Sequence, residues 1–108
     1  MVAVARFEVF LVTLDPTVGA EMQKTRPCVV VSPDELNAHL GHVIVAPLTS
    51  TIRPFRFRVT TTIAGRQSSV VLDQLRTVDV GRLGKRIGKV DTRAMMDILG
   101  TLQAMFAA

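Results

Sequence analysis

The feature of the sequence that most limits the fold is a change of hydrophobic period near residue 91. Before it, apolar residues lie in short β-branched segments separated by turn residues, which is typical of strands. After it, apolar residues recur three and four positions apart, which is typical of a helix with one apolar face. That face consists of Met95, Ile98, Leu99, Leu102, Met105 and Phe106. The sequence therefore predicts short strands followed by one long helix, with Asp91 placed to cap its first turn.

Turn residues divide the chain before the helix into predicted elements. Residues 15–27 are predicted to form a polar loop, and residues 33–40 and 80–83 helical turns. Strands are predicted at residues 6–13, 28–32, 42–48, 55–63, 69–72 and 85–90. Short strands followed by one amphipathic helix favour a mainly β (α+β) fold, a small half-open barrel with short helical turns and the C-terminal α-helix packed on it.

Length and composition limit the class of protein. A chain of 108 residues with 48% apolar residues suffices for one domain, residues 1–108, and is too apolar for intrinsic disorder. One cysteine and two histidines allow neither an intramolecular disulfide nor the usual closed zinc site, so we expect no metal and no cofactor. The longest stretch without Asp, Glu, Lys or Arg, residues 36–52, contains polar residues and a proline, so we expect no membrane span. The N-terminus has no basic segment before an apolar run, which favours a cytoplasmic protein.

Charge is distributed unevenly along the chain. Residues 1–52 carry three basic and five acidic residues, whereas residues 53–108 carry ten basic and four acidic residues. The second half therefore has the charge of a surface that faces a polyanion. Within it, Arg56 and Arg58 alternate with Phe55 and Phe57, which on an extended strand would place the arginines on one face and the rings on the other. The alternative is a solvated strand face that only keeps the domain soluble.

Four segments carry a resemblance to a known family. They are Asp-Pro-Thr-Val-Gly-Ala-Glu at residues 15–21, Lys-Thr-Arg-Pro at 24–27, Val-Ile-Val-Ala-Pro-Leu-Thr at 43–49 and Asp-Gln-Leu-Arg-Thr-Val-Asp at 73–79. In this order and spacing they resemble the MazF/PemK family of toxin endoribonucleases of type II toxin–antitoxin systems. The resemblance implies an SH3-like barrel, a homodimer, metal-independent cleavage of single-stranded RNA at short specific sequences, and neutralisation by a cognate antitoxin.

Two regions depart from the pattern of this family. Phe7 follows Arg6 where the family usually has glycine, and Ala20 and Met22 stand where it usually has serine and glutamine. A loop hydroxyl and an amide that could contact RNA are therefore absent. These departures bear on sequence specificity and, to a lesser degree, on activity.

RNA is most easily cleaved without a metal when the ribose 2′-hydroxyl attacks its own phosphate. The step needs a proton acceptor at the hydroxyl, a donor at the leaving 5′-oxygen and positive charge around the phosphate, and it leaves a 2′,3′-cyclic phosphate. The resemblance points to Arg26 as the phosphate-stabilising charge and to Thr49 as an orienting hydroxyl. Glu21 is the nearest conventional base. The alternatives are an ion pair of Arg26 with Glu21 or Asp15, a turn-capping Thr49 and a solvated Glu21.

Candidate RNA-binding residues flank these positions. They are Lys24, Thr25, Ser50, Arg53, Arg56, Gln74 and Arg76. The alternative for Arg76 is a structural ion pair with Asp73 or Asp79. Because the chain has no Trp and no Tyr, base stacking would rely on arginine planes or on an outward-turned Phe55 or Phe57. The expected partners are single-stranded RNA, an acidic cognate antitoxin and a second copy of the chain.

Other chemically notable residues are predicted to be inert, and two other functions stay open. Cys28 begins an apolar run and is expected to be a buried small hydrophobe rather than a nucleophile. His39 and His42 could form a proton pair, although no role is assigned to them. One alternative function is a non-catalytic toxin that binds a protein such as DNA gyrase through its C-terminal helix, and the other is a degenerate member that binds RNA without cutting it.

Overall fold

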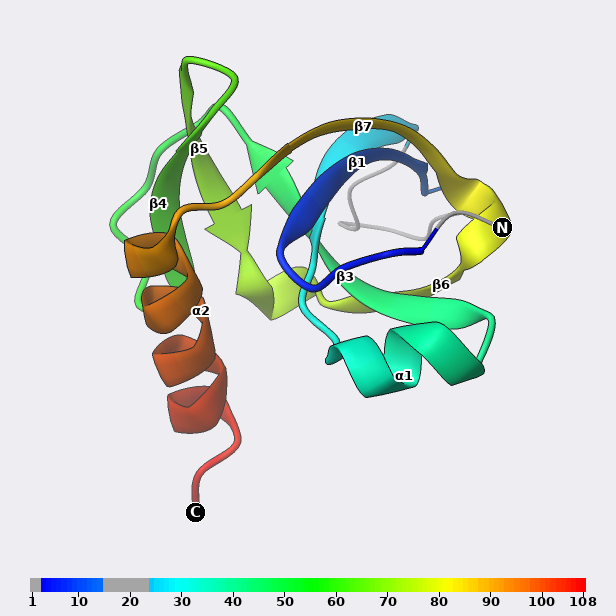
Figure 1. Cartoon of the computed structure of the whole chain (residues 1–108). Helices are drawn as coiled ribbons and strands as arrows, with labels where there is room; N and C mark the ends of the chain where they lie inside the picture. Colours follow the sequence, from blue (N-terminus) through cyan, green and yellow to red (C-terminus); the bar gives the residue numbers. More distant parts are fainter. Residues whose placement is uncertain (1–2, 15–23) are drawn as a thin grey trace.

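The chain folds into a curled antiparallel sheet with one long helix beside it (Figure 1). The computed structural model describes residues 3–14 and 24–108. Its strands are β1 (Glu8–Thr13), β2 (Thr25–Val30), β3 (His42–Thr49), β4 (Arg58–Ile63), β5 (Arg66–Val71), β6 (Arg76–Asp79) and β7 (Leu83–Lys89). Its helices are α1 (Asp34–His39) and α2 (Thr92–Met105), with 3₁₀ turns η1 (Leu72–Gln74) and η2 (Val80–Arg82).

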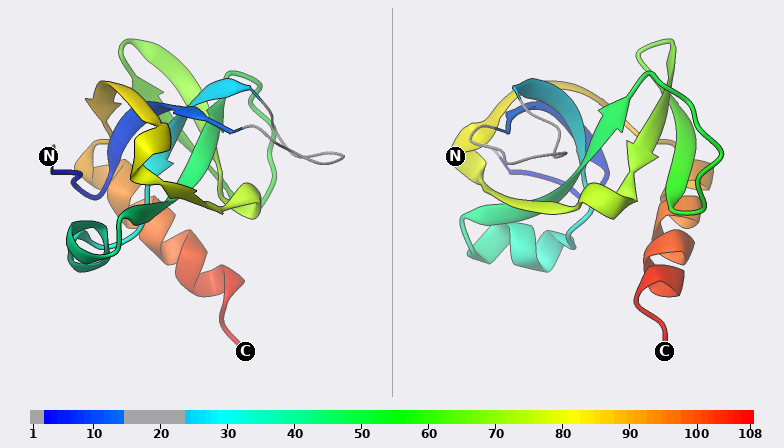
Figure 2. Two further views of the ribbon diagram at one scale, coloured as in Figure 1. Left: turned by 90° about the vertical axis from the view of Figure 1, so that its right-hand side faces the viewer. Right: turned by 180° about the vertical axis from the view of Figure 1, so that it is seen from behind.

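The sheet curls because β3 pairs with three different strands. Its first half pairs with β6, its middle with β2 and its last two residues with β5. The remaining neighbours give the order β4-β5-β3-β2-β1-β7, and irregular pairing of β1 with β7 adds local bending. Figure 2 shows the curled strands on one side of the molecule and the β4–β5 hairpin with α2 on the other. The half-open barrel with a C-terminal helix that the sequence predicts is thereby confirmed.

Both faces of the central strands are buried, which creates two apolar clusters. Successive residues of β1 and β2 alternate between them: Val9 and Val29 belong to the cluster that includes α2, and Phe10 and Cys28 belong to the other. This explains why β2 has an apolar run instead of an alternating pattern. The cluster shared with α2 ties the helix to the barrel.

The predicted apolar face of α2 is largely confirmed. The Asp91 side chain caps the helix by accepting a hydrogen bond from the Ala94 backbone N–H at 2.8 Å. Ile98 is fully buried, whereas Phe106 is 74% exposed because the helix ends at Met105. The residues that pack at the edge of the buried cluster are Met95, Leu99, Leu102 and Met105. Among the described residues, no helix is long and apolar enough to cross a membrane.

The predicted loop 15–27 is wrong at its C-terminal end, because residues 25–27 belong to β2. Thr25, Arg26 and Pro27 continue the pairing with β1 that begins at Val29. A proline is a loop signal in the sequence, but pairing with a distant strand overrides it here. Arg26 therefore projects from a strand of the sheet and not from a loop.

The predicted strand 55–63 is wrong at its N-terminal end, where residues 55–57 form a turn. The Arg58 backbone N–H donates to the Phe55 carbonyl at 3.2 Å, and the Phe55 N–H donates to the Arg53 carbonyl at 2.8 Å. Phe55 is 53% exposed, so it does not share an inward face with Phe57. Strand β6 was missed altogether because its four residues lack an apolar alternation, and its pairing with β3 creates it.

The departure at Phe7 is structural. Its φ of 73° lies in the left-handed region that favours glycine, which explains the glycine usual at this place in the resembling family. The ring is 7% exposed and belongs to the cluster shared with α2. Burial of a phenylalanine side chain offsets the backbone strain of about 1–3 kcal/mol.

Candidate nucleic-acid groove

Arg26 and Thr49 lie in one groove, on neighbouring strands. The pairing of β2 with β3 runs from Val30↔Val45 to Cys28↔Pro47, and two more residues in the same register bring Arg26 opposite Thr49. Both residues line a groove of about 610 Å³ together with Ser50. Three of the predicted positions are therefore brought together by strand pairing.

One nitrogen of the Arg26 guanidinium, Nε, lacks a hydrogen-bond acceptor among the residues that the structure describes. This nitrogen is also buried. A buried charged donor without a partner is costly, so such an atom is most stable when an anion or acceptor binds it. The predicted alternative, an ion pair with Glu21 or Asp15, involves two residues outside the described part of the chain.

The hydroxyl of Thr49 caps the turn that follows β3. Its Oγ1 accepts a hydrogen bond from the Thr51 backbone N–H at 3.2 Å. This is the turn-capping role given as an alternative, and it leaves the hydroxyl proton available to a ligand because a hydroxyl both accepts and donates. The cap fixes the orientation of the hydroxyl in the groove, so the two roles are compatible.

The β4–β5 hairpin, which no local sequence pattern places near Thr49, forms another wall of the groove. Ile63 at the end of β4 and Arg66 and Gln67 at the start of β5 line it. A turn signal such as Ala64-Gly65 does not say which distant strand a hairpin will face. Arg66 adds a second arginine to the lining of this groove beside Arg26.

The other predicted RNA-binding residues do not line this groove as the structure describes it. Lys24 and Thr25 are exposed at the start of β2, and Arg53 is exposed in the segment between β3 and β4. Arg56 lines a different hollow, Gln74 lies in η1 and Arg76 lies on β6 opposite Val45. Glu21, the predicted base, lies outside the described residues.

The two aspartates that were weighed as partners of Arg76 have other contacts of their own. Asp73 receives two hydrogen bonds from the Arg58 guanidinium, at 3.2 and 3.4 Å. Asp79 accepts from the Gly81 N–H at 2.7 Å and so caps η2. These contacts give both carboxylates a structural role.

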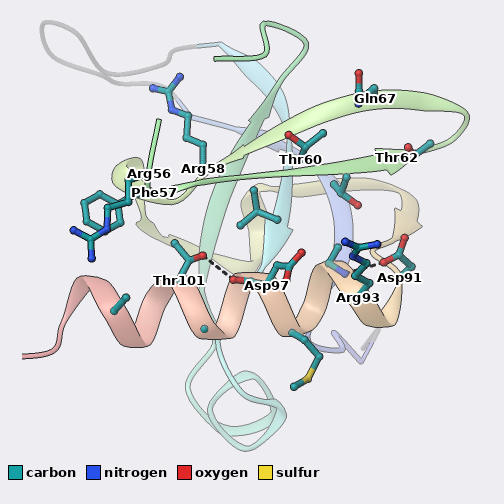
Figure 3. A pocket seen from close by; sticks show the side chains of 16 residues that line it. Arg56, Phe57, Arg58, Thr60, Thr62, Gln67, Asp91, Arg93, Asp97 and Thr101 are labelled. Atoms are coloured by element: carbon teal, nitrogen blue, oxygen red, sulfur yellow. Dashed lines mark hydrogen bonds between the residues drawn. The ribbon is translucent and has the colours of Figure 1, made fainter. Parts of the chain in front are cut away.

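A larger hollow of about 830 Å³ lies between the edge strand β4 and helix α2 (Figure 3). Arg56, Arg58 and Arg93 line it, and so do Asp91 and Asp97. Its charges are mixed, and Arg26 and Thr49 are not part of its described lining. Size alone would favour this hollow, but the buried Nε of Arg26, without a partner in the part of the chain that the structure describes, favours the smaller groove.

Cys28 is buried next to the groove and is predicted to be chemically inert. Burial raises the pKa of its thiol from 9.0 to about 12, although the guanidinium groups of Arg26 and Arg76 lower it. We expect iodoacetamide to modify the native protein far more slowly than the unfolded chain at pH 8, because only the thiolate reacts. Mass spectrometry of timed samples measures both rates, and equal rates would contradict burial of this thiol.

The same pKa shift has a consequence for stability. Between pH 9.0 and 12 the unfolded chain loses the Cys28 proton while the folded chain keeps it. The unfolded state therefore binds fewer protons, and the free energy of unfolding falls as the pH rises through this window. In a Cys28→Ala variant, the free energy of unfolding should fall less between pH 9.0 and 12 than it does in the wild-type protein.

These observations define a class of small half-open β-barrel proteins that hold an arginine, Arg26, and a turn-capping hydroxyl, that of Thr49, in one groove. Within that class, residues 5–106 match the family model of PemK-like, MazF-like toxins of type II toxin–antitoxin systems, and the chain belongs to this family. The chain is 38% identical over 106 residues to the endoribonuclease PemK of Escherichia coli, which covers 93% of this chain and 80% of that protein.

Solved structures show the same fold. The crystal structure of MazF from Deinococcus radiodurans superposes with a TM-score of 0.87 at 22% identity and covers 100% of both chains. A mycobacterial endoribonuclease in complex with its cognate antitoxin superposes with a TM-score of 0.81 at 24% identity, covering 94% of this chain and 93% of that one. Together with the sequence relatives, these findings confirm the predicted family and the predicted enzyme class, an endoribonuclease. The roles of individual groove residues stay predictions.

Proposed function

We propose that this protein is a toxin that cleaves single-stranded RNA at specific sequences, by attack of the 2′-hydroxyl on the neighbouring phosphate and without a metal ion. The observation that carries the proposal is the buried Nε of Arg26, which has no hydrogen-bond partner among the described residues and lies in a groove shared with Thr49. A guanidinium can donate two parallel hydrogen bonds to one phosphate, which makes Arg26 well suited to bind an RNA backbone.

In this proposal each groove residue has a distinct task. Arg26 donates to the non-bridging phosphate oxygens and stabilises the extra negative charge of the five-coordinate phosphorane. Thr49, oriented by the Thr51 N–H, donates its hydroxyl proton to the same phosphate and holds the scissile linkage in place. Glu21 is the proposed proton acceptor at the 2′-hydroxyl. The bond from the 2′-oxygen to phosphorus forms as the bond from phosphorus to the 5′-oxygen breaks, and the leaving 5′-oxygen takes a proton from water. DNA lacks the 2′-hydroxyl and is not cleaved.

The remaining RNA contacts are proposed to come from the basic residues around the groove. Arg53 and Arg56 are exposed in the segment between β3 and β4, and Lys24 and Thr25 lie next to Arg26 in the chain. Ser50 lies in the groove itself. With Gln74 and Arg76, these residues would bind phosphates and base edges on either side of the cut.

The proposed partners follow from charge and exposed apolar surface. A net charge of +4 favours an acidic antitoxin, and a solved structure of the same fold contains a cognate antitoxin. Met96 on helix α2 is 65% exposed and Phe106, which follows the helix, is 74% exposed, which supports contact with a second copy of the chain. An enzyme of this kind acts in the cytoplasm, where its RNA substrates lie.

The test is cleavage of a long mixed-sequence RNA by the purified protein, with and without excess EDTA. We expect cuts at one short sequence, unchanged by EDTA, with 2′,3′-cyclic phosphate and 5′-hydroxyl ends, which end-specific enzymes and mass spectrometry identify. Replacement of the 2′-hydroxyl by hydrogen at the cut site should abolish cleavage. RNA left intact by stoichiometric protein would refute the proposal and favour a member of the family that only binds. Loss of activity in EDTA would refute metal independence.

A further inference from the structure

The segment between β3 and β4 holds an aromatic ring at the surface. Phe55 is 53% exposed, in a chain that has five Phe, no Trp and no Tyr. Phe57, two positions on, is half-buried and lies under the guanidinium of Arg56 at 5.2 Å from the ring centroid. The structure therefore distinguishes Phe55 from Phe57 as an outward-turned ring.

Phe55 is held in place by a chain of contacts. The Arg58 guanidinium lies 4.7 Å from the centroid of the Phe55 ring, which is the geometry of a cation–π contact. The same guanidinium donates two hydrogen bonds to the Asp73 carboxylate, and its side chain is only 15% exposed. The backbone hydrogen bonds of Phe55 to Arg53 and Arg58 fix the main chain. An exposed ring supported in this way loses little conformational freedom when a ligand stacks on it.

The register of the sheet places Arg58, whose guanidinium contacts the Phe55 ring, on the same face as Thr49. Thr49 pairs with Ser69, Ser69 pairs with Thr60, and strand alternation puts Thr60 and Arg58 on one face of β4. Figure 3 shows Arg58 directed away from α2 on the outer side of the β4–β5 hairpin. Two strand spacings and two residues along the strand separate the Cα atoms of Thr49 and Arg58 by about 12 Å. A strand of RNA bound at Thr49 can therefore place a neighbouring base on Phe55.

We propose that Phe55 is a base-stacking, specificity-determining residue of the RNA site, and that Asp73 positions it through Arg58. One nucleobase next to the scissile linkage stacks on the exposed ring face, with Arg58 behind the ring. The exposed Arg53 and Arg56 bind the adjoining phosphates. This inference rests on the proposed function, because it assigns a base to the same RNA that Arg26 and Thr49 are proposed to cleave.

The experiment uses a short RNA that contains the mapped cleavage sequence. Stacking of one base contributes about 1–3 kcal/mol, so we expect Phe55→Ala to raise KM about 5- to 150-fold while kcat changes less than about twofold. Phe55→Trp should restore KM. Asp73→Asn should raise KM less than Phe55→Ala does, because it weakens the hydrogen bonds that hold Arg58 against the ring while the Phe55 ring itself stays in place. The matched control is Leu40→Ala, since Leu40 is also 53% exposed but lies after α1.

A scan with abasic nucleotides separates stacking from a general loss of affinity. In the wild-type protein, removal of one particular base should raise KM by the same factor as Phe55→Ala, and in Phe55→Ala removal of that base should have no further effect. If the wild-type protein cuts the RNA but the effects of Phe55→Ala and of base removal on KM multiply at every position, the stacking assignment is overturned and the nuclease function stands. If Phe55→Ala leaves KM unchanged and only weakens binding of an acidic antitoxin peptide, Phe55 belongs to a protein interface. Absence of wild-type cleavage and binding would overturn both proposals.

Discussion

Arg26→Ala is expected to reduce kcat/KM for RNA cleavage by about 10²- to 10³-fold without unfolding the protein. Loss of one donor that stabilises transition-state charge in a groove has an effect of this size. Because the Arg26 Nε atom has no hydrogen-bond partner among the described residues, its removal takes away a desolvation cost and no described hydrogen bond. The melting temperature should therefore stay unchanged or rise, which is typical of a residue kept for function at the expense of stability.

Two further variants test whether Arg26 acts through its hydrogen-bonding geometry, through its positive charge, or only through the net charge of the protein. Arg26→Lys keeps a point charge but cannot donate two parallel hydrogen bonds, so we expect only a partial recovery of kcat. Arg93→Ala removes the same charge from the exposed surface of α2 and should leave kcat within about twofold of the wild-type value. Single-turnover cleavage and thermal melting measure both quantities. Full activity of Arg26→Ala would remove Arg26 from the catalytic step.

The position of Arg26 shows which part of the site the sequence could predict. The motifs that contain Arg26 and Thr49 can be recognised in the sequence. That the two residues lie close together depends on the pairing of β2 with β3, which is set by apolar residues such as Val29 and Ala46. The sequence also placed Arg26 in a loop, because Pro27 is a local loop signal and pairing with β1 is a distant effect. Residue types therefore predicted the chemistry, whereas strand register determines the geometry of the groove.

The segment around Phe55 shows why a short-range pattern can fail. Alternating Arg and Phe residues are typical of a strand, but Pro54 and the turn hydrogen bonds at Phe55 interrupt the extended backbone. The contact of Arg58 with Asp73 joins residues fifteen positions apart, and no local pattern predicts it. Phe7 is a similar case, since burial of its ring in a non-local cluster outweighs a backbone conformation that favours glycine.

Ile98→Ala is expected to lower the free energy of unfolding by about 2–5 kcal/mol. Ile98 is fully buried in the cluster that joins α2 to the sheet, so the truncated side chain leaves a cavity lined by residues such as Val59 and Leu72. A protein of this size has a total stability of about 5–15 kcal/mol, and a loss of this size shifts the melting temperature by about 10 °C or more. Urea unfolding followed by circular dichroism measures the change.

The control for this variant is Gln103→Ala, on the exposed side of the same helix. Both substitutions introduce alanine, a strong helix former. The change in helix propensity therefore differs between the two variants by no more than about a few tenths of a kcal/mol. The difference between the two variants therefore measures packing of α2 on the sheet. Because Ile98 lies outside the described lining of the Arg26 groove, folded Ile98→Ala protein at low temperature should keep its cleavage rate. Equal stability of the two variants would mean that α2 does not pack on the barrel in solution as the buried cluster requires.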